Sequence, residues 1–276
     1  MASGGASVTS RGRVAIVTGA ARGIGAATTL ALASDGWCVL AVDIAAGDPA
    51  IPYSLASAAD LDATVTAANA SADGSERVRG HIADVRDRAA LGAAVAAAES
   101  HWGGLDAAIA CAAVIAGGVP AWELPVERDQ ALLDVDLGGV LNLARVAVPA
   151  MLRRPEPRSG RFVAVASAAA TRGLPMLAAY CAAKAGVAGF VRALATELGN
   201  TGVTANAVSP GSTDTDMLDE SARLYDLADS NGFATQQPIG RLIEATEVAA
   251  VIAFLAGESS SAMTGAVVPV DGGLSL

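Results

Sequence analysis

Residues 13–25 read RVAIVTGAARGIG, and their order decides the fold: an apolar strand, then a glycine-rich turn, then the start of a helix. Side chains at the glycines would keep the backbone away from a diphosphate, whereas bare backbone lets the first N–H groups of the helix point at it. Ordinary tight turns also use glycine, so the motif is specific through its context, a strand before and a helix after. We expect five residues of this turn to bind a dinucleotide: Gly19, Arg22, Gly23, Ile24 and Gly25.

An acid follows at the end of the next apolar segment, where Asp43 stands 18 residues after Gly25. A carboxylate there accepts hydrogen bonds from both hydroxyls of an adenosine ribose and repels a 2′-phosphate. Arg22 argues for NADP, because a basic residue in the turn can hold a 2′-phosphate. Alternatively, Arg22 simply covers the phosphates of the cofactor. The sequence predicts NAD as the cofactor, with NADP as the alternative.

Outward from this turn, strand-like and helix-like segments alternate along the whole chain. Such alternation is typical of a parallel sheet covered by helices on both faces, so we predict an α/β fold with a doubly wound, seven-stranded parallel sheet. The expected strands are 13–18, 37–43, 77–83, 105–111, 160–167, 202–208 and 265–270. The expected helices are 23–35, 57–70, 86–101, 122–153, 177–199, 215–229 and 245–256. One domain over 13–276 follows a loose polar tail over 1–12.

Composition excludes several classes of function. The 276 residues carry a net charge of −10, which opposes binding to nucleic acid phosphates. No apolar run is long enough to span a membrane, and the N-terminus lacks the order of a secretory signal, so we expect a soluble protein. The cysteines have no metal-ligand spacing, and neither His81 nor His101 has a ligand or triad partner nearby in sequence. We expect no metal, and buried, reduced thiols in a cytoplasm at Cys38, Cys111 and Cys181.

The segment AYCAAKAG, residues 179–186, contains the one lysine among the 18 basic residues. Tyr180 and Lys184 are four apart on the expected helix and so share one face. A cation within about 4–6 Å lowers a phenol pKa by roughly 1–3 units, which predicts a usable acid/base. A compact ammonium also reaches ribose hydroxyls that a planar guanidinium fits less well. Ser167, at the expected C-terminal end of a strand, is placed to donate to a substrate oxygen.

Together these motifs resemble the short-chain dehydrogenase/reductase family over nearly the whole chain, which implies a Rossmann fold and a homotetramer. TGAARGIG is similar to its glycine loop, S…YCAAK to its catalytic set, SPGSTDT to its PG motif and VDGG to its C-terminal signature. The resemblance implies that Tyr180 exchanges the proton, Ser167 holds the reacting oxygen and Lys184 binds the nicotinamide ribose. It also implies further cofactor contacts at Asp84, Val85, Ala112, Ala113, Pro210, Gly211, Thr213 and Thr215.

Two positions depart from the family pattern. Residues 110–113 read ACAA where the family has NNAG, so the side-chain bonds of that motif are absent and only backbone packing remains. Asp136 stands where the family has a catalytic Asn. If the main-chain carbonyl at this position holds the relay water, Asp136 still serves as a catalytic residue; if the side-chain amide is needed as a donor, activity should fall. A carboxylate there would also alter the charge balance around Lys184.

An insertion of about 44–60 follows Asp43, and Pro49, Pro52 and Tyr53 indicate an ordered loop on the adenosine side. With CAAVIAGG and TGAVVPVDGG it resembles the mycofactocin-associated subgroup. That resemblance implies non-exchanging NAD whose electrons pass to mycofactocin. The substrate is set by the loop after Ser167 and by residues 215–240, whose apolar and small side chains indicate a small uncharged alcohol or carbonyl. A benign insertion in an ordinary dehydrogenase with exchanging NAD is the second interpretation. The third is a catalytically silent nucleotide-binding protein.

Overall fold

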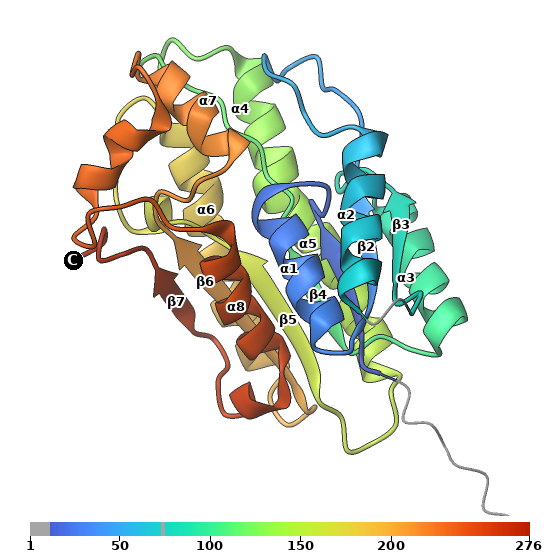
Figure 1. The fold of residues 1–276 in the computed structure, drawn as a ribbon. Coiled ribbons are helices and arrows are strands. Elements are labelled where there is room, and N and C mark those ends of the chain that lie inside the picture. The colour runs from blue at the N-terminus through green and yellow to red at the C-terminus, as the bar shows by residue number, and fades with distance from the viewer. Residues whose placement is uncertain (1–11, 73–74) are drawn as a thin grey trace, which may run out of the picture.

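The sheet of this protein is parallel throughout and follows the order β3-β2-β1-β4-β5-β6-β7 (Figure 1). The computed structural model describes residues 12–72 and 75–276, so the expected tail over 1–12 lies outside the described residues except for Gly12. Helices α1, α2 and α8 cover one face of the sheet, and α3, α5 and α6 cover the other. The predicted doubly wound, seven-stranded α/β fold is confirmed.

The elements have these bounds. The strands are β1 (Val14–Thr18), β2 (Cys38–Asp43), β3 (Val78–Ile82), β4 (Ala107–Ala110), β5 (Gly160–Val165), β6 (Val203–Pro210) and β7 (Val267–Val270). The α-helices are α1 (Gly23–Ser34), α2 (Ala58–Ser71), α3 (Arg88–Trp102), α4 (Val126–Leu132), α5 (Gly139–Leu152), α6 (Ala178–Glu197), α7 (Asp216–Leu224) and α8 (Ala245–Ala256). A π-helical turn, η1 (Leu133–Gly138), joins α4 to α5, and short 3-10 helices are η2 (Ala168–Ala170), η3 (Ser230–Gln236) and η4 (Glu258–Ser260).

Strand β1 shows how the sequence makes two cores. Alternate residues of a strand point to opposite faces, and a strand covered on both faces must be apolar throughout. Ile16 packs into the core under α3, α5 and α6, while Ala15 and Val17 pack under α1 and α8. All five residues of β1 are buried. The apolar run in the sequence is therefore the signature of a central strand.

The order of the strands reverses at β1, which pairs with β2 on one side and β4 on the other. At such a point the connections leave toward opposite faces, and a crevice opens at the carboxyl ends of the strands. The turn after β1 and the segments after β4 and β5 all reach this crevice. The topology alone therefore brings Gly19, Ala112 and Ser167 to one site.

Several predicted boundaries were wrong. The expected helix 122–153 begins only at Val126, after Pro125, and is interrupted by η1. Helix α7 ends at Leu224, not at residue 229, and η3 follows it. The insertion ends at Ser57, whose side chain caps α2, so the loop spans residues 44–57. No helix among the described residues is long and apolar enough to cross a membrane.

The expectation of buried cysteines was also wrong, because all three thiols are free and each residue is partly exposed. Cys38 begins β2, and Cys111 lies just past the end of β4. Cys181 follows Tyr180 on α6, and its Sγ lies 3.7 Å from the carbonyl oxygen of Arg172. Each of the three nevertheless packs against a hydrophobic cluster, so these positions lie at the edge of the core and not within it.

Candidate active site

A cavity of about 560 Å³ lies at the carboxyl ends of the central strands. Its wall includes Ser167 and every residue that the sequence assigned to the cofactor: Gly19, Arg22, Gly23, Ile24, Gly25, Asp43, Asp84, Val85, Ala112, Ala113, Tyr180, Lys184, Pro210, Gly211, Thr213 and Thr215. Asp136 lies behind this wall and is fully buried. The structure thus gathers residues from the whole length of the chain around one space.

The glycine turn is held by close backbone contacts. A Cβ on Gly19, where φ is +67°, would lie 2.6 Å from the Cα of Ala112, and a Cβ on Gly25 would lie 2.0 Å from the Gly19 carbonyl oxygen. Helix α1 has no side-chain cap and no acid in its first turn. Its first N–H groups have no intrahelical partner and face the cavity, which suits a negatively charged group.

The carboxylate of Asp43 is fixed at the wall of the cavity. One of its oxygens accepts the N–H of Ala21 at 3.1 Å, and the other accepts the N–H of Ala45 at 3.1 Å. Each carboxylate oxygen retains a further lone pair for a ligand hydroxyl. Two backbone donors therefore orient a negative charge beside the glycine turn.

Arg22 connects two segments on opposite sides of the cavity. Its Nη1 lies 2.7 Å from the Asp216 carboxylate at the start of α7, and its Nη2 donates to the Ser54 carbonyl at 3.0 Å. Both ends of the guanidinium are therefore engaged by protein groups. Neither points at Asp43, so the structure gives Arg22 a linking position that the sequence did not suggest.

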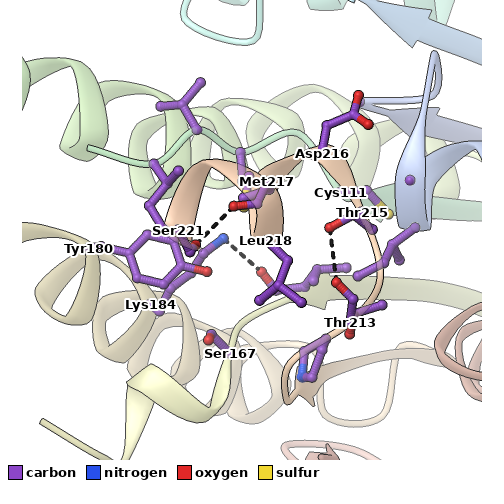
Figure 2. A pocket seen from close by; sticks show the side chains of 18 of the residues that line it. Cys111, Ser167, Tyr180, Lys184, Thr213, Thr215, Asp216, Met217, Leu218 and Ser221 are labelled. Atoms are coloured by element: carbon purple, nitrogen blue, oxygen red, sulfur yellow. Dashed lines mark hydrogen bonds between the residues drawn. The ribbon is translucent and has the colours of Figure 1, made fainter. Parts of the chain in front are cut away.

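Tyr180, Lys184 and Ser167 meet in one part of the cavity, as Figure 2 shows. The Lys184 ammonium lies 5.5 Å from the centroid of the Tyr180 ring and donates to the Val165 carbonyl at 3.2 Å. The Ser167 Oγ accepts the N–H of Ala169 at 3.1 Å and caps η2. The one lysine of the chain is thus buried beneath the tyrosine, as the four-residue spacing predicts.

Asp136 stands within the π-helical turn, on the inner side of the same group. One of its oxygens accepts the N–H of Val114 at 2.8 Å. The other lies 3.4 Å from the Lys184 ammonium and has no other partner. Asp136 is 0 % exposed and Lys184 is 2 % exposed, so the two charges form a pair inside the protein.

Burial dominates the proton affinities of this group. It raises the pKa of the Tyr180 phenol; the Lys184 ammonium acts in the opposite direction and the Asp136 carboxylate in the same direction. The expectation that Lys184 leaves the phenol with a lowered pKa was therefore wrong for the protein alone. Burial likewise raises the pKa of Asp136. Burial lowers the pKa of Lys184, but Asp136 and Tyr180 outweigh it and the pKa is raised, so the ammonium stays protonated.

The inserted loop, residues 44–57, is fastened across the cavity at three places. Asp48 pairs with Arg86 at 2.6 Å, and the N–H of Ile115 donates to the Tyr53 hydroxyl at 3.0 Å. The third contact is the bond from Arg22 to Ser54. The prolines and Tyr53 had indicated an ordered loop, but Arg86 carried no sequence signal beyond its position two residues after Asp84.

The other end of the cavity is mostly apolar. Tyr225 stacks edge-on against Phe233 at 6.1 Å between ring centroids, and its hydroxyl donates to the Pro175 carbonyl at 2.7 Å. These residues belong to the loop after Ser167 and to residues 215–240, the regions that the sequence indicates for the substrate. Six residues line this end: Leu174, Leu177, Met217, Leu218, Tyr225 and Phe233. Their segments are far apart in sequence, so no local pattern could have grouped them.

Comparison with known proteins agrees with this geometry. A family model described as enoyl-(acyl carrier protein) reductase matches residues 19–275. An uncharacterized oxidoreductase of Mycobacterium tuberculosis is 35% identical over 273 residues, covering 95% of this chain and 96% of the relative. The chain belongs to the short-chain dehydrogenase/reductase family.

Two solved members of the family show the fold with different cofactors. Carveol dehydrogenase from Mycobacterium avium, in complex with NAD, has a TM-score of 0.89 and 31% identity, covering 96% of this chain and 98% of that one. An actinorhodin polyketide ketoreductase with NADPH has a TM-score of 0.85 and 32% identity, covering 96% and 97%. The protein is accordingly an NAD(P)-dependent oxidoreductase of this family.

One family motif is replaced by backbone packing. At residues 110–113, where the family has NNAG, the N–H of Ala112 lies 3.5 Å from the Thr18 hydroxyl, which lies 3.4 Å from the Ile109 carbonyl. The backbone of Gly19 also packs closely against Ala112 in the same segment. The floor of the cavity is therefore formed although the asparagine side chains are absent.

The Gly25→Ala variant should lose most of its affinity for the nicotinamide dinucleotide. Its Cβ would meet the Gly19 carbonyl at 2.0 Å, so the turn must open. Gly92→Ala in α3 is the matched control, since its nearest contact would be 3.9 Å away. Fluorescence titration with NADH, checked by thermal unfolding, measures the difference. Equal affinities in both variants would contradict this account of the turn.

Proposed function

We propose that the protein is an NAD-dependent oxidoreductase that interconverts an alcohol and a carbonyl by hydride transfer. The observation that carries the proposal is the common cavity, in which Tyr180, Lys184 and Ser167 face the same space as the glycine turn and Asp43. A proton-transfer group beside a dinucleotide cradle is the arrangement that alcohol oxidation needs, because hydride and proton leave the substrate together.

The cavity fits the cofactor at several points. The exposed N–H groups of α1 suit the diphosphate, and Asp43 suits the adenosine ribose hydroxyls. Asp84 and Val85 would contact the adenine, and Ala112 and Ala113 would form the floor. Four residues would surround the nicotinamide and its carboxamide: Pro210, Gly211, Thr213 and Thr215.

NAD, when bound, supplies the carbon that accepts or donates the hydride. Tyr180 exchanges a proton with the substrate oxygen, and Ser167 holds that oxygen by a hydrogen bond. Lys184 binds the nicotinamide ribose hydroxyls and favours the ionised phenol. The positive charge of the oxidised ring acts on the phenol in the same direction, against the effect of burial.

Tyr180→Phe should reduce turnover by about 10²–10⁴-fold while NAD still binds, because a general acid/base is removed and the cradle is left intact. Tyr225→Phe removes a hydroxyl from the same cavity and should retain most activity. Alcohol oxidation and NADH binding are measured for both. A wild-type protein that binds NADH and turns over no alcohol or carbonyl would favour the silent nucleotide-binding interpretation instead.

The choice of NAD over NADP rests on Asp43 and Arg22. Asp43 carries a fixed negative charge where a 2′-phosphate would lie, and like charges repel. Arg22, the residue that could hold that phosphate, is already engaged by Asp216 and Ser54. The NAD complex of the carveol dehydrogenase supports this choice.

Asp43→Ser should weaken the preference for NAD. The ratio of kcat/KM with NAD to kcat/KM with NADP should fall by roughly tenfold or more, which corresponds to about 1.4 kcal/mol. Asp35→Ser is the control, because it removes an exposed carboxylate at the end of α1. An unchanged ratio in Asp43→Ser would remove the basis for NAD selectivity.

The proposal extends to a tightly held NAD that mycofactocin re-oxidises. Its support is the inserted loop, which is fastened to Arg86, Ile115 and Arg22 and so covers the cofactor end of the cavity. A dinucleotide beneath such a loop leaves only when these contacts open. An external carrier must then collect the electrons. The alternative, freely exchanging NAD, requires that the loop open in every cycle.

We propose further that the protein is a cytoplasmic homotetramer and that it acts on a small uncharged, hydrophobic alcohol. The three free thiols support a reducing compartment, and the apolar end of the cavity supports the substrate class. Val126 and Leu133, 62% and 41% exposed on α4 and the turn that follows it, support an interface there. The name of the carveol dehydrogenase is consistent with such an alcohol.

Native mass spectrometry should find four chains, each carrying NAD through purification. Asp48→Asn should reduce the bound NAD, because it removes the ion pair with Arg86 that fastens the loop. Asp62→Asn, an exposed carboxylate on α2, should leave it unchanged. Wild-type protein that arrives free of NAD and uses added NAD at steady state would contradict the non-exchange part alone.

A further inference from the structure

The buried pair of Asp136 and Lys184 has a geometry that the proposed chemistry leaves unexplained. The second oxygen of Asp136 lies 3.4 Å from the ammonium and makes no other bond. An amide of the same shape would keep the bond from the Val114 N–H. The carboxylate therefore adds a negative charge next to Lys184 that the fold itself does not require.

We propose that Asp136 is a positioning residue whose carboxylate binds the Lys184 ammonium. Its negative charge offsets part of the positive charge by which Lys184 stabilises the ionised Tyr180 phenol. The proposal rests on the proposed function of Tyr180 as the acid/base. The role of the pair is to set the pH at which the Tyr180 phenol ionises, both for alcohol oxidation and for carbonyl reduction.

The direction of the effect follows from the charges. An ammonium stabilises the phenolate and a carboxylate destabilises it. Both groups lie in the protein interior, where water screens little of their interaction. Asp136 should thus keep Tyr180 protonated to higher pH. Alcohol oxidation, which needs the phenolate, should begin at higher pH than with an amide at residue 136.

Other groups also face the pair and must stay constant in any test. Four side chains interact with Tyr180, Lys184 or Asp136: Ser167 at the start of η2, Cys181 on α6, Cys111 after β4 and Tyr53 in the inserted loop. A substitution at residue 136 leaves these four side chains in place, although it also removes the Asp136 charge that contributes to the raised pKa of Tyr53. A shift in the ionisation of Tyr180 would therefore report the loss of the carboxylate.

The test is a titration of the tyrosine rings, which are only three in number: Tyr53, Tyr180 and Tyr225. Protein labelled with ¹³C at the ring Cζ is followed by NMR as pH rises, within the range where circular dichroism shows the fold intact. Tyrosine-to-phenylalanine variants assign the three signals. Neither substrate nor cofactor is needed, so the result stands whether or not the proposed function holds.

Asp136→Asn should shift the Tyr180 titration downward by roughly one pH unit, while Asp134→Asn should not shift it. Asp134 is exposed and stands in the same π-helical turn, so it loses the same charge at the surface. Asp136→Ala gives the same test if the amide variant fails to fold. In the pH profile of kcat/KM for alcohol oxidation, the rise on the acidic side should shift to lower pH together with the Tyr180 titration.

A Tyr180 signal that titrates identically in wild type and in Asp136→Asn would overturn the proposal. It would mean that the carboxyl is uncharged, or that Asp136 only holds the Val114 segment, a role that the amide also fulfils. If the Tyr180 signal shifts but the wild-type protein shows no turnover, the proposed function fails, while the effect of Asp136 on the ionisation of Tyr180 stands.

Discussion

The close approach of the glycine turn to the segment after β4 is the constraint on which the rest of the site depends. Backbone meets backbone at Gly19 and Ala112, with no room for a Cβ between them. This contact joins the two strands at which the sheet order reverses. The position of the free N–H groups of α1 and the floor of the cavity both depend on this contact.

Charge is distributed unevenly in this acidic protein. Its surface ion pairs are screened by water and contribute little to stability. The pair inside the active centre is costly to bury, and removal of one partner alone would leave an uncompensated charge. Lys184 and Asp136 are therefore constrained together, and an arginine at residue 184 would bring a larger, planar group into a site where both partners are already fully buried.

The fold was predictable because each of its signals is local. An apolar run of five residues, a glycine turn and an acid at the next strand end identify β1, α1 and β2 without reference to the rest of the chain. What the sequence missed is set by contacts between distant segments: the link from Arg22 to Asp216 and the π-helical turn at Asp136. The sign of the Tyr180 shift was missed for the same reason, since burial is a property of the whole fold.

One guanidinium contacts both the inserted loop and the first residue of α7, so a single side chain bridges two walls of the cavity. The loop borders the cofactor end and α7 borders the substrate end. Energetic linkage between two sites is reciprocal. Any coupling between the two binding equilibria would have to be equal in both directions, and the Arg22 guanidinium is a contact in this structure through which it could pass.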